Sequence, residues 1–198
     1  MSISNIVQRG LFHIFGGLVI CMAALFLPRT ALLIALAAIT FPFLIFELVR
    51  FNQPGINRWF VSFFKSLLRE EEALRLTGTS YMLIASLIIF TVFERDIAIL
   101  SLAFLAVGDA TAMMVGMQIG KRRLLGKTLA GDLVCIISCL AIGSIFYFSV
   151  ISLPFPIIIV GALVGSISEA LSLPVNDNLS MPLLAGIAMT LMQNQLYS

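Results

Sequence analysis

Six ionisable side chains lie inside or close to long apolar runs of the sequence. They are His13, Glu47, Asp109, Asp132, Glu169 and Asp177. A charge in such surroundings is costly, so each of these groups needs a partner or a chemical role. Carboxylates can bind a divalent metal, accept a proton from a hydroxyl or line an ion pathway. The residue types therefore indicate a polar site inside an apolar protein.

Asp109 is the acid that a purely structural explanation fits least well. It lies eight residues from the nearer end of the apolar run over 97–117, which is about 12 Å deep at 1.5 Å per residue. Its side chain is too short to reach water from that depth, so a metal, a cation or a wet cavity must hold its charge. Glu47 and Asp132 lie near the ends of their runs and could simply face water.

A segment rich in glycine and basic residues follows the run that contains Asp109. Between Gly116 and Thr128 it contains Gly120, Lys121, Arg122, Arg123, Gly126 and Lys127. Cations, glycine backbone and the start of the next helix near Thr128 could together bind phosphate. The segment is not a Walker A loop, because the position of the first glycine holds Lys121. A basic loop that only sets membrane orientation is the simpler alternative.

Small residues accompany both of the deeper acids. Gly108, Ala112, Gly116 and Gly120 surround Asp109, and Gly161, Gly165 and Ser168 precede Glu169. Small residues let helix backbones approach closely, so the two helices could pack around a shared polar site. Tight packing alone would also explain the glycines, but not the acids beside them.

The composition shows what kind of protein must position these residues. The 198 residues are 60% hydrophobic and 11% charged, whereas a soluble domain has roughly 25% charged residues. A soluble globule and a disordered chain are therefore excluded. The net charge of +2 gives no reason to expect nucleic acid binding. Because no small-residue cleavage site follows the first apolar run, we expect a retained first helix.

The hydropathy pattern predicts an all-α, polytopic membrane bundle that forms a single domain over 1–198. Seven spans are expected, at about 10–27, 30–49, 77–93, 97–117, 128–152, 155–173 and 179–196. An interfacial amphipathic helix is expected over about 56–75, with aromatic rings facing the membrane and charges facing water.

The distribution of basic residues predicts the orientation. With seven spans, one side of the membrane has ten of the twelve basic residues, and the other side has only Arg29 and Arg95. The positive-inside rule then predicts a cytoplasmic N-terminus. The six ionisable groups would lie toward the same cytoplasmic face.

A series of short motifs occurs in order along nearly the whole chain. They are Arg9 and His13 with Gly16-Gly17, Glu47 with Arg50, Arg69-Glu70, Thr77 to Tyr81, Gly108-Asp109 with Ala112, Gly116 and Gly120, Gly126 to Leu129 with Gly131, Glu169, and Asp177-Asn178-Leu179. In this series the chain resembles the membrane-bound lipid-alcohol kinases that include dolichol kinase, phytol kinase and CTP-dependent diacylglycerol kinase. Asp132 and Asn176 depart from the family pattern, which more often has a small hydroxyl residue and an aspartate at these positions.

The resemblance implies phosphoryl transfer from a nucleotide, with CTP as the expected donor, to the hydroxyl of a polyprenol, phytol or diacylglycerol. It implies Mg²⁺ held by Asp109 with Asp177 or Glu169. Asp109 or Glu169 could instead accept the hydroxyl proton, and His13 could contact the acceptor or a phosphate. The expected phosphate-binding residues are Lys121, Arg122, Arg123, Gly126, Lys127 and Thr128. Further candidates for the site are Glu47, Arg50, Asp132 and Asn178.

Two alternative functions and three properties stay open at the level of sequence. The first alternative function is that of a phosphatidate cytidylyltransferase. That family has a similar loop with an aspartate, glycines and basic residues, but its signature rich in serine, proline and lysine is absent from this sequence. A small transporter would also have intramembrane acids, but its site tends to lie near the midplane between repeats. The identity of the lipid, the choice between CTP and ATP, and the presence of a homodimer are not determined.

Overall fold

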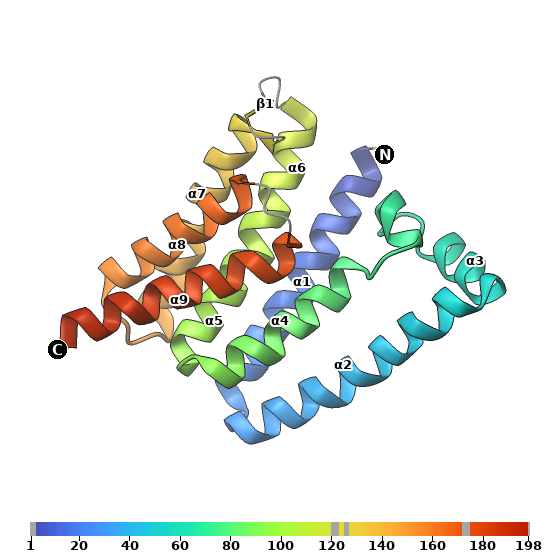
Figure 1. Cartoon of the computed structure of the whole chain (residues 1–198). Helices are drawn as coiled ribbons and strands as arrows, with labels where there is room; N and C mark the ends of the chain where they lie inside the picture. Colours follow the sequence, from blue (N-terminus) through green and yellow to red (C-terminus); the bar gives the residue numbers. More distant parts are fainter. Residues whose placement is uncertain (1–2, 120–122, 125–126, 172–174, 198) are drawn as a thin grey trace.

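The computed structural model describes residues 3–119, 123–124, 127–171 and 175–197. The chain forms a helical bundle with a small hairpin at one end (Figure 1). Its elements are α1 (Ile3–Phe26), α2 (Arg29–Asn52), α3 (Pro54–Phe63), the 3₁₀ helix η1 (Glu70–Ala73), α4 (Gly78–Val92), α5 (Arg95–Ala103), the π-helical turn η2 (Phe104–Asp109), α6 (Ala110–Ile119), β1 (Arg123–Leu124), β2 (Lys127–Thr128), α7 (Leu129–Ser149), α8 (Phe155–Ala170) and α9 (Asp177–Tyr197). The expected all-helical class is confirmed, with the two-residue antiparallel pair β1–β2 as an addition.

Four helices in the described part of the chain are long and apolar enough to cross a membrane. They are α1, α2, the continuous helix over Arg95–Gln118, and α7. Helices α4 and α8 are apolar but have only 15 and 16 residues, and about 20 are needed for a plain span. Helices lie over all seven expected segments, but the count of seven spans stays a prediction.

The continuous helix formed by α5, η2 and α6 lies at the centre of the bundle. It contacts α1 on one side and α7, α8 and α9 on others. Ile97 to Ala106 are fully buried, which explains why all of these residues except Ser101 are apolar. A π-helical turn over Phe104–Asp109 interrupts the regular α-helix. Such turns are rare in proteins, and those that do occur are often found at functional sites. Asp109 is the last residue of this turn.

The interfacial helix expected over about 56–75 is shorter and is broken in the structure. Helix α3 begins with a proline in its first turn and ends at Phe63, and η1 follows after a turn. Glu72 fixes the segment after the break, because its carboxylate accepts hydrogen bonds from the backbone nitrogens of Arg69 at 2.7 Å and Gly78 at 2.8 Å. These two bonds join the segment to the start of α4.

A buried network around Arg50 ties the end of α2 to the segments that follow it. Arg50 and Glu47 are fully buried, and Arg50 Nε donates to Glu47 Oε2 at 2.8 Å. The guanidinium also donates to Asn57 Oδ1 and to the backbone oxygens of Glu72 and Arg75. Buried charges need such complete pairing. This network, which we call the Arg50 network, fixes α3 and η1 against α2.

The other end of the network reaches the first turn of α4. Glu47 Oε1 accepts hydrogen bonds from Thr77 Oγ1 at 2.8 Å and from Ser80 Oγ at 2.9 Å. Thr77 is also the N-cap of α4, where its side chain accepts from the nitrogen of Ser80. Capping residues satisfy backbone donors that a helix start leaves unpaired. Glu47 therefore positions the start of α4 relative to α2.

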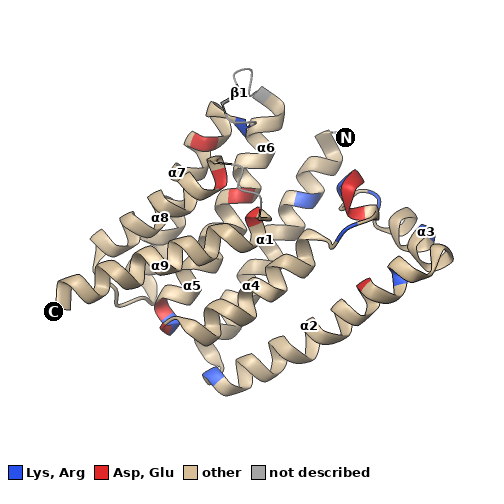
Figure 2. Cartoon of the chain, in the orientation of Figure 1, with Lys and Arg blue, Asp and Glu red and all other residues tan. Residues whose placement is uncertain are grey.

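Charged residues gather at both ends of the bundle, as Figure 2 shows. At the end away from the hairpin, Arg29 donates to the backbone oxygen of Phe90 at 2.9 Å, and Arg95 to that of Ala24 at 2.6 Å. Carbonyls in the last turn of a helix lack intrahelical partners. Arg29 and Arg95, the two basic residues on the side with few positive charges, therefore supply hydrogen-bond donors to carbonyls at the ends of α4 and α1. The cytoplasmic N-terminus stays a prediction.

Candidate active site

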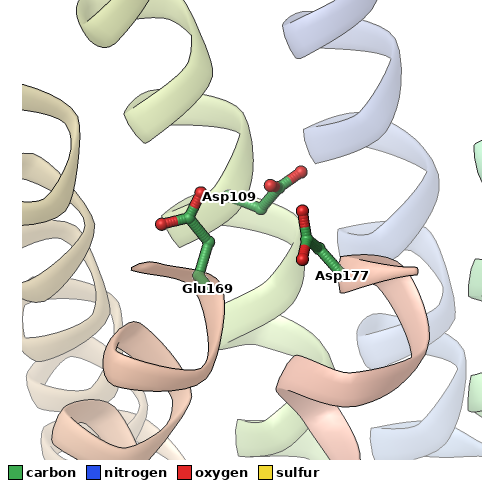
Figure 3. A group of neighbouring side chains, drawn as sticks. All are labelled: Asp109, Glu169 and Asp177. Carbon is green, nitrogen blue, oxygen red and sulfur yellow. The ribbon is translucent and has the colours of Figure 1, made fainter. Parts of the chain in front are cut away.

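Three acidic side chains from three elements meet inside the bundle. Asp109 is contributed by η2, Glu169 by the last turn of α8 and Asp177 by the first residue of α9. Their carboxylate oxygens lie within 4.8 Å of one another. Figure 3 shows the three side chains extending into the same region. We call Asp109, Glu169 and Asp177 the acidic group. Asp109 and Glu169 are buried, and Asp177 is partly exposed.

Small residues bring these helices together. A Cβ added at Gly161 of α8 would come within 2.5 Å of Met189 Sδ on α9. A Cβ added at Gly116 of α6 would come within 2.6 Å of Thr128 Oγ1 at the start of α7. Only glycine allows approaches as close as these. The glycines therefore serve helix packing, and this packing also brings the acids of the different helices together.

Lys127 lies between two members of the acidic group. Its Nζ donates to Glu169 Oε1 at 2.6 Å and to Asp177 Oδ2 at 2.9 Å. Burial alone would lower the pKa of Lys127, but the two carboxylates outweigh that effect and raise it above its ordinary value. Lys127 is therefore a cation at neutral pH. It offsets one of the negative charges of the acidic group.

Two buried polar atoms at the site lack a hydrogen-bond partner among the described residues. They are Nε2 of His13, on α1, and Oε2 of Glu169. The His13 nitrogen lies 4.0 Å from Asp109 Oδ2, which is beyond hydrogen-bond distance. Buried polar atoms are nearly always paired, so unpaired ones indicate a water, an ion or a ligand. The acidic group is therefore suited to hold a further species.

A polar cavity of about 360 Å³ adjoins the acidic group. Two cations, Arg69 and Lys127, line it together with the three acids and Asp132. The remaining lining residues are Ala112, Met113, Gly116, Met117, Thr128 and Gly131. Thr128 is the N-cap of α7 and accepts a hydrogen bond from the nitrogen of Gly131 at 3.2 Å. The start of α7 therefore faces the cavity, and a helix start favours anions.

The structure places the predicted phosphate-binding residues only in part. Lys127 and Thr128 line the polar cavity. Lys121, Arg122 and Gly126 lie outside the described residues. Arg123 pairs with Thr128 through the backbone of β1 and β2, and its side chain is also outside the described part. Phosphate binding by most residues of this loop therefore stays a prediction.

A second cavity, of about 190 Å³ and mostly apolar, lies on the other side of His13. Its lining consists of Arg9, Phe12, His13, Phe43, Phe60, Phe64, Leu67, Leu68, Glu72, Thr77, Gly78, Thr79 and Asn178. Asn178, a predicted site candidate, belongs to this apolar cavity. Glu47 and Arg50 line neither cavity and belong to the Arg50 network.

Sequence reasoning did not assign two arginines to the site. Arg69 lines the polar cavity and Arg9 lines the apolar one. Arg69 was expected on the water-facing side of an interfacial helix, but the break at Phe63 turns it toward the acids. Arg9 was named only as part of the family resemblance, without a role in the site. Both arginines belong to the motifs that carry the family resemblance, and from these motifs they could have been predicted as site residues.

Comparison with known proteins gives three relatives. An uncharacterized protein of Rickettsia prowazekii is 32% identical over 182 residues, which cover 89% of each chain. The CTP-dependent diacylglycerol kinase 1 of Schizosaccharomyces pombe is 30% identical over 154 residues, covering 70% of this chain and 71% of the yeast protein. The chain belongs to the family of the CTP-dependent diacylglycerol kinases.

A more distant member agrees with this assignment. The CTP-dependent diacylglycerol kinase 1 of Eremothecium gossypii is 26% identical over 170 residues, which cover 74% of this chain and 54% of that protein. No family model and no solved structure matches the chain. The family supports a lipid kinase in general terms. Together with the long apolar helices, it indicates an integral membrane protein. These relatives give no support for a homodimer.

Proposed function

We propose that the protein transfers the terminal phosphoryl group of a nucleotide, with CTP as the expected donor, to the hydroxyl of a membrane lipid alcohol. Diacylglycerol is the first acceptor to test, because two relatives are named for it. The observation that carries the proposal is the acidic group with Lys127 at a polar cavity, in a chain of this family. A cytoplasmic position of the site, as the charge bias predicts, would give the nucleotide access.

The acidic group suits Mg²⁺. This ion prefers carboxylate and phosphate oxygens. The group offers three carboxylates, and Oε2 of Glu169 has no hydrogen-bond partner among the described residues. Asp109, Glu169 and Asp177 would hold the ion. When bound, Mg²⁺ would neutralise phosphate charge and help to orient the transferred group.

The cations of the polar cavity would bind the donor phosphates. Phosphoryl transfer depends mainly on positioning and charge neutralisation, with little covalent help from the protein. Lys127 and Arg69 line the cavity, and the N-terminus of α7 adds backbone donors near Thr128. The undescribed part of the loop, with Lys121 and Arg122, would add further positive charge.

The proposed reaction is a displacement at the terminal phosphorus. The acceptor hydroxyl oxygen forms a bond to this phosphorus, while the bond from phosphorus to the bridging oxygen breaks and the nucleoside diphosphate leaves. The hydroxyl proton passes to a carboxylate. Asp109 and Glu169 are the candidates because both are buried beside the polar cavity, and the one that accepts the proton would not also hold the ion.

A direct test uses the purified protein with labelled CTP or ATP, Mg²⁺ and a panel of diacylglycerol, phytol, a polyprenol and phosphatidate in mixed micelles. The proposal expects a phosphorylated lipid and a nucleoside diphosphate as products. Formation of a cytidine-diphosphate lipid from phosphatidate, with release of pyrophosphate, would instead identify a cytidylyltransferase. Absence of nucleotide turnover with every lipid would refute the proposed function.

A further inference from the structure

The apolar cavity and the polar cavity share a wall. His13 lines the apolar cavity, and its Nε2 lies 4.0 Å from Oδ2 of Asp109, which lines the polar cavity. At the start of α9, Asp177 lines the polar cavity and the next residue, Asn178, lines the apolar one. His13 and the start of α9 therefore separate the apolar cavity from the acidic group.

The segment after α3 divides between the two cavities in the same way. Leu67 and Leu68 line the apolar cavity, and the following residue, Arg69, lines the polar one. The Glu72 hydrogen bonds to the nitrogens of Arg69 and Gly78 fix this turn. The separation into an apolar and a polar compartment is therefore built by three elements, α1, the 67–69 turn and the start of α9.

The lining of the apolar cavity matches a molecule with hydrocarbon at one end and oxygen atoms at the other. Phe12, Phe43, Phe60 and Phe64 supply aromatic walls. Hydrogen-bonding groups are supplied by Arg9, His13 and Thr79. The Arg9 side chain lies 3.9 Å from Glu72 Oε1, too far for a hydrogen bond. Apolar walls with a few convergent polar groups are typical of small-molecule sites.

We propose that this apolar cavity binds the hydroxyl-bearing end of the acceptor lipid, and that Arg9 recognises an ester carbonyl of a glycerolipid there. The inference rests on the proposed function. A glycerolipid offers ester oxygens to the donors of Arg9 and Thr79, and it brings its free hydroxyl to the wall formed by His13 and Asp109. A polyprenol or phytol has only one oxygen and would leave these partly buried donors without a partner, which costs binding energy.

The first experiment blocks the cavity. Leu68→Trp fills it from a partly exposed position, and Phe63→Trp is the matched control, because Phe63 is 70% exposed and does not line the cavity. We expect Leu68→Trp to raise the KM for diacylglycerol by about tenfold or more and to leave the KM for CTP unchanged. Phe63→Trp should leave both unchanged. Equal KM values for diacylglycerol in the wild type and Leu68→Trp would overturn the inference while the proposed function stands.

The second experiment does not need turnover. A diacylglycerol with a diazirine near the glycerol end of one acyl chain should label residues 60–68 in the wild type, and unlabelled diacylglycerol should compete. Labelling should be lost in Leu68→Trp and kept in Phe63→Trp. Labelling confined to residues that do not line the apolar cavity would overturn the inference. Because binding is measured directly, this result decides the matter even if the purified protein phosphorylates no lipid.

The third experiment tests Arg9. Arg9→Met keeps much of the apolar stem and removes the donors. We expect the ratio of kcat/KM for diacylglycerol to kcat/KM for a polyprenol to fall by about tenfold, and competition by diacylglycerol for the diazirine label to weaken similarly. An unchanged ratio together with unchanged competition would remove Arg9 from recognition of the ester.

Discussion

Replacing Asp109 with Asn tests whether the acidic group holds a metal. The substitution keeps the shape of the side chain and removes its charge. Asp109 is buried beside Glu169 and Asp177, with carboxylate oxygens within 4.8 Å of one another. Two unit charges at that separation repel by about 3 kcal/mol at an effective dielectric constant of 20. Lys127 donates hydrogen bonds to the other two acids, so it offsets the repulsion on Asp109 less directly.

The variant should therefore gain stability and lose activity. Without metal, we expect its free energy of unfolding to rise by up to about 3 kcal/mol, which is a rise in Tm of several degrees. With Mg²⁺, the wild type should gain about 2.7 kcal/mol at a concentration 100 times the Kd, and the variant should gain much less. Turnover should fall by about 100-fold or more, because a charge that holds the metal is missing, which corresponds to about 2.7 kcal/mol.

Turnover and Tm are measured on the same preparation in detergent, with and without Mg²⁺. Asp132→Asn is the control, because Asp132 lines the polar cavity outside the acidic group. It should change turnover by less than Asp109→Asn does. Full activity in Asp109→Asn, with an undiminished stabilisation by Mg²⁺, would refute the metal assignment. The kinase proposal would then rest on the family alone.

Three further predictions address the phosphate contacts, the topology and the buried charges. Lys127→Ala should raise the nucleotide KM or lower turnover by about ten- to a hundredfold. Lys65→Ala, at an exposed position outside the polar cavity, should do neither. If the two variants have the same nucleotide KM and turnover, Lys127 does not belong to the site. Single cysteines placed at positions 5 and 121 should both react only with reagents on the cytoplasmic side, and opposite labelling would contradict seven spans. Arg50→Met should destabilise the protein by about 3 to 5 kcal/mol, because it leaves Glu47 buried without its cation; a Tm equal to that of the wild type would show that the Arg50 network is dispensable.

The sequence predicted the positions of the helices well, because membrane helices are long and locally encoded. It also identified Asp109, Glu169 and Asp177 as candidates, since charge in an apolar run is recognisable without a structure. The structure adds that their oxygens converge. This convergence depends on how α8 and α9 pack against the central helix, and the packing is set by contacts between residues far apart in the sequence.

Other features of the site could not be read from local patterns. The pairing of Lys127 with Glu169 joins residues 42 positions apart, so the sequence suggested only a phosphate contact for this lysine. The placement of Arg69 depends on the end of α3 at Phe63, although the helical spacing of apolar residues continues beyond it. The turn after α3 is fixed by hydrogen bonds from the backbone nitrogens of Arg69 and Gly78 to the carboxylate of Glu72. Tertiary hydrogen bonds of this kind have no periodic signature.

The π-helical turn over Phe104–Asp109 has a consequence for the history of the family. A π turn holds more residues than an α-helix of the same length, so it can arise when one residue is inserted into a regular helix. Loss of one residue between Phe104 and Gly108 would return the stretch to α geometry and keep both ends of the helix in place. A relative that lacks the π turn is therefore expected to show a single-residue gap here. Aligning such a relative without the gap would match the wrong residue to Asp109.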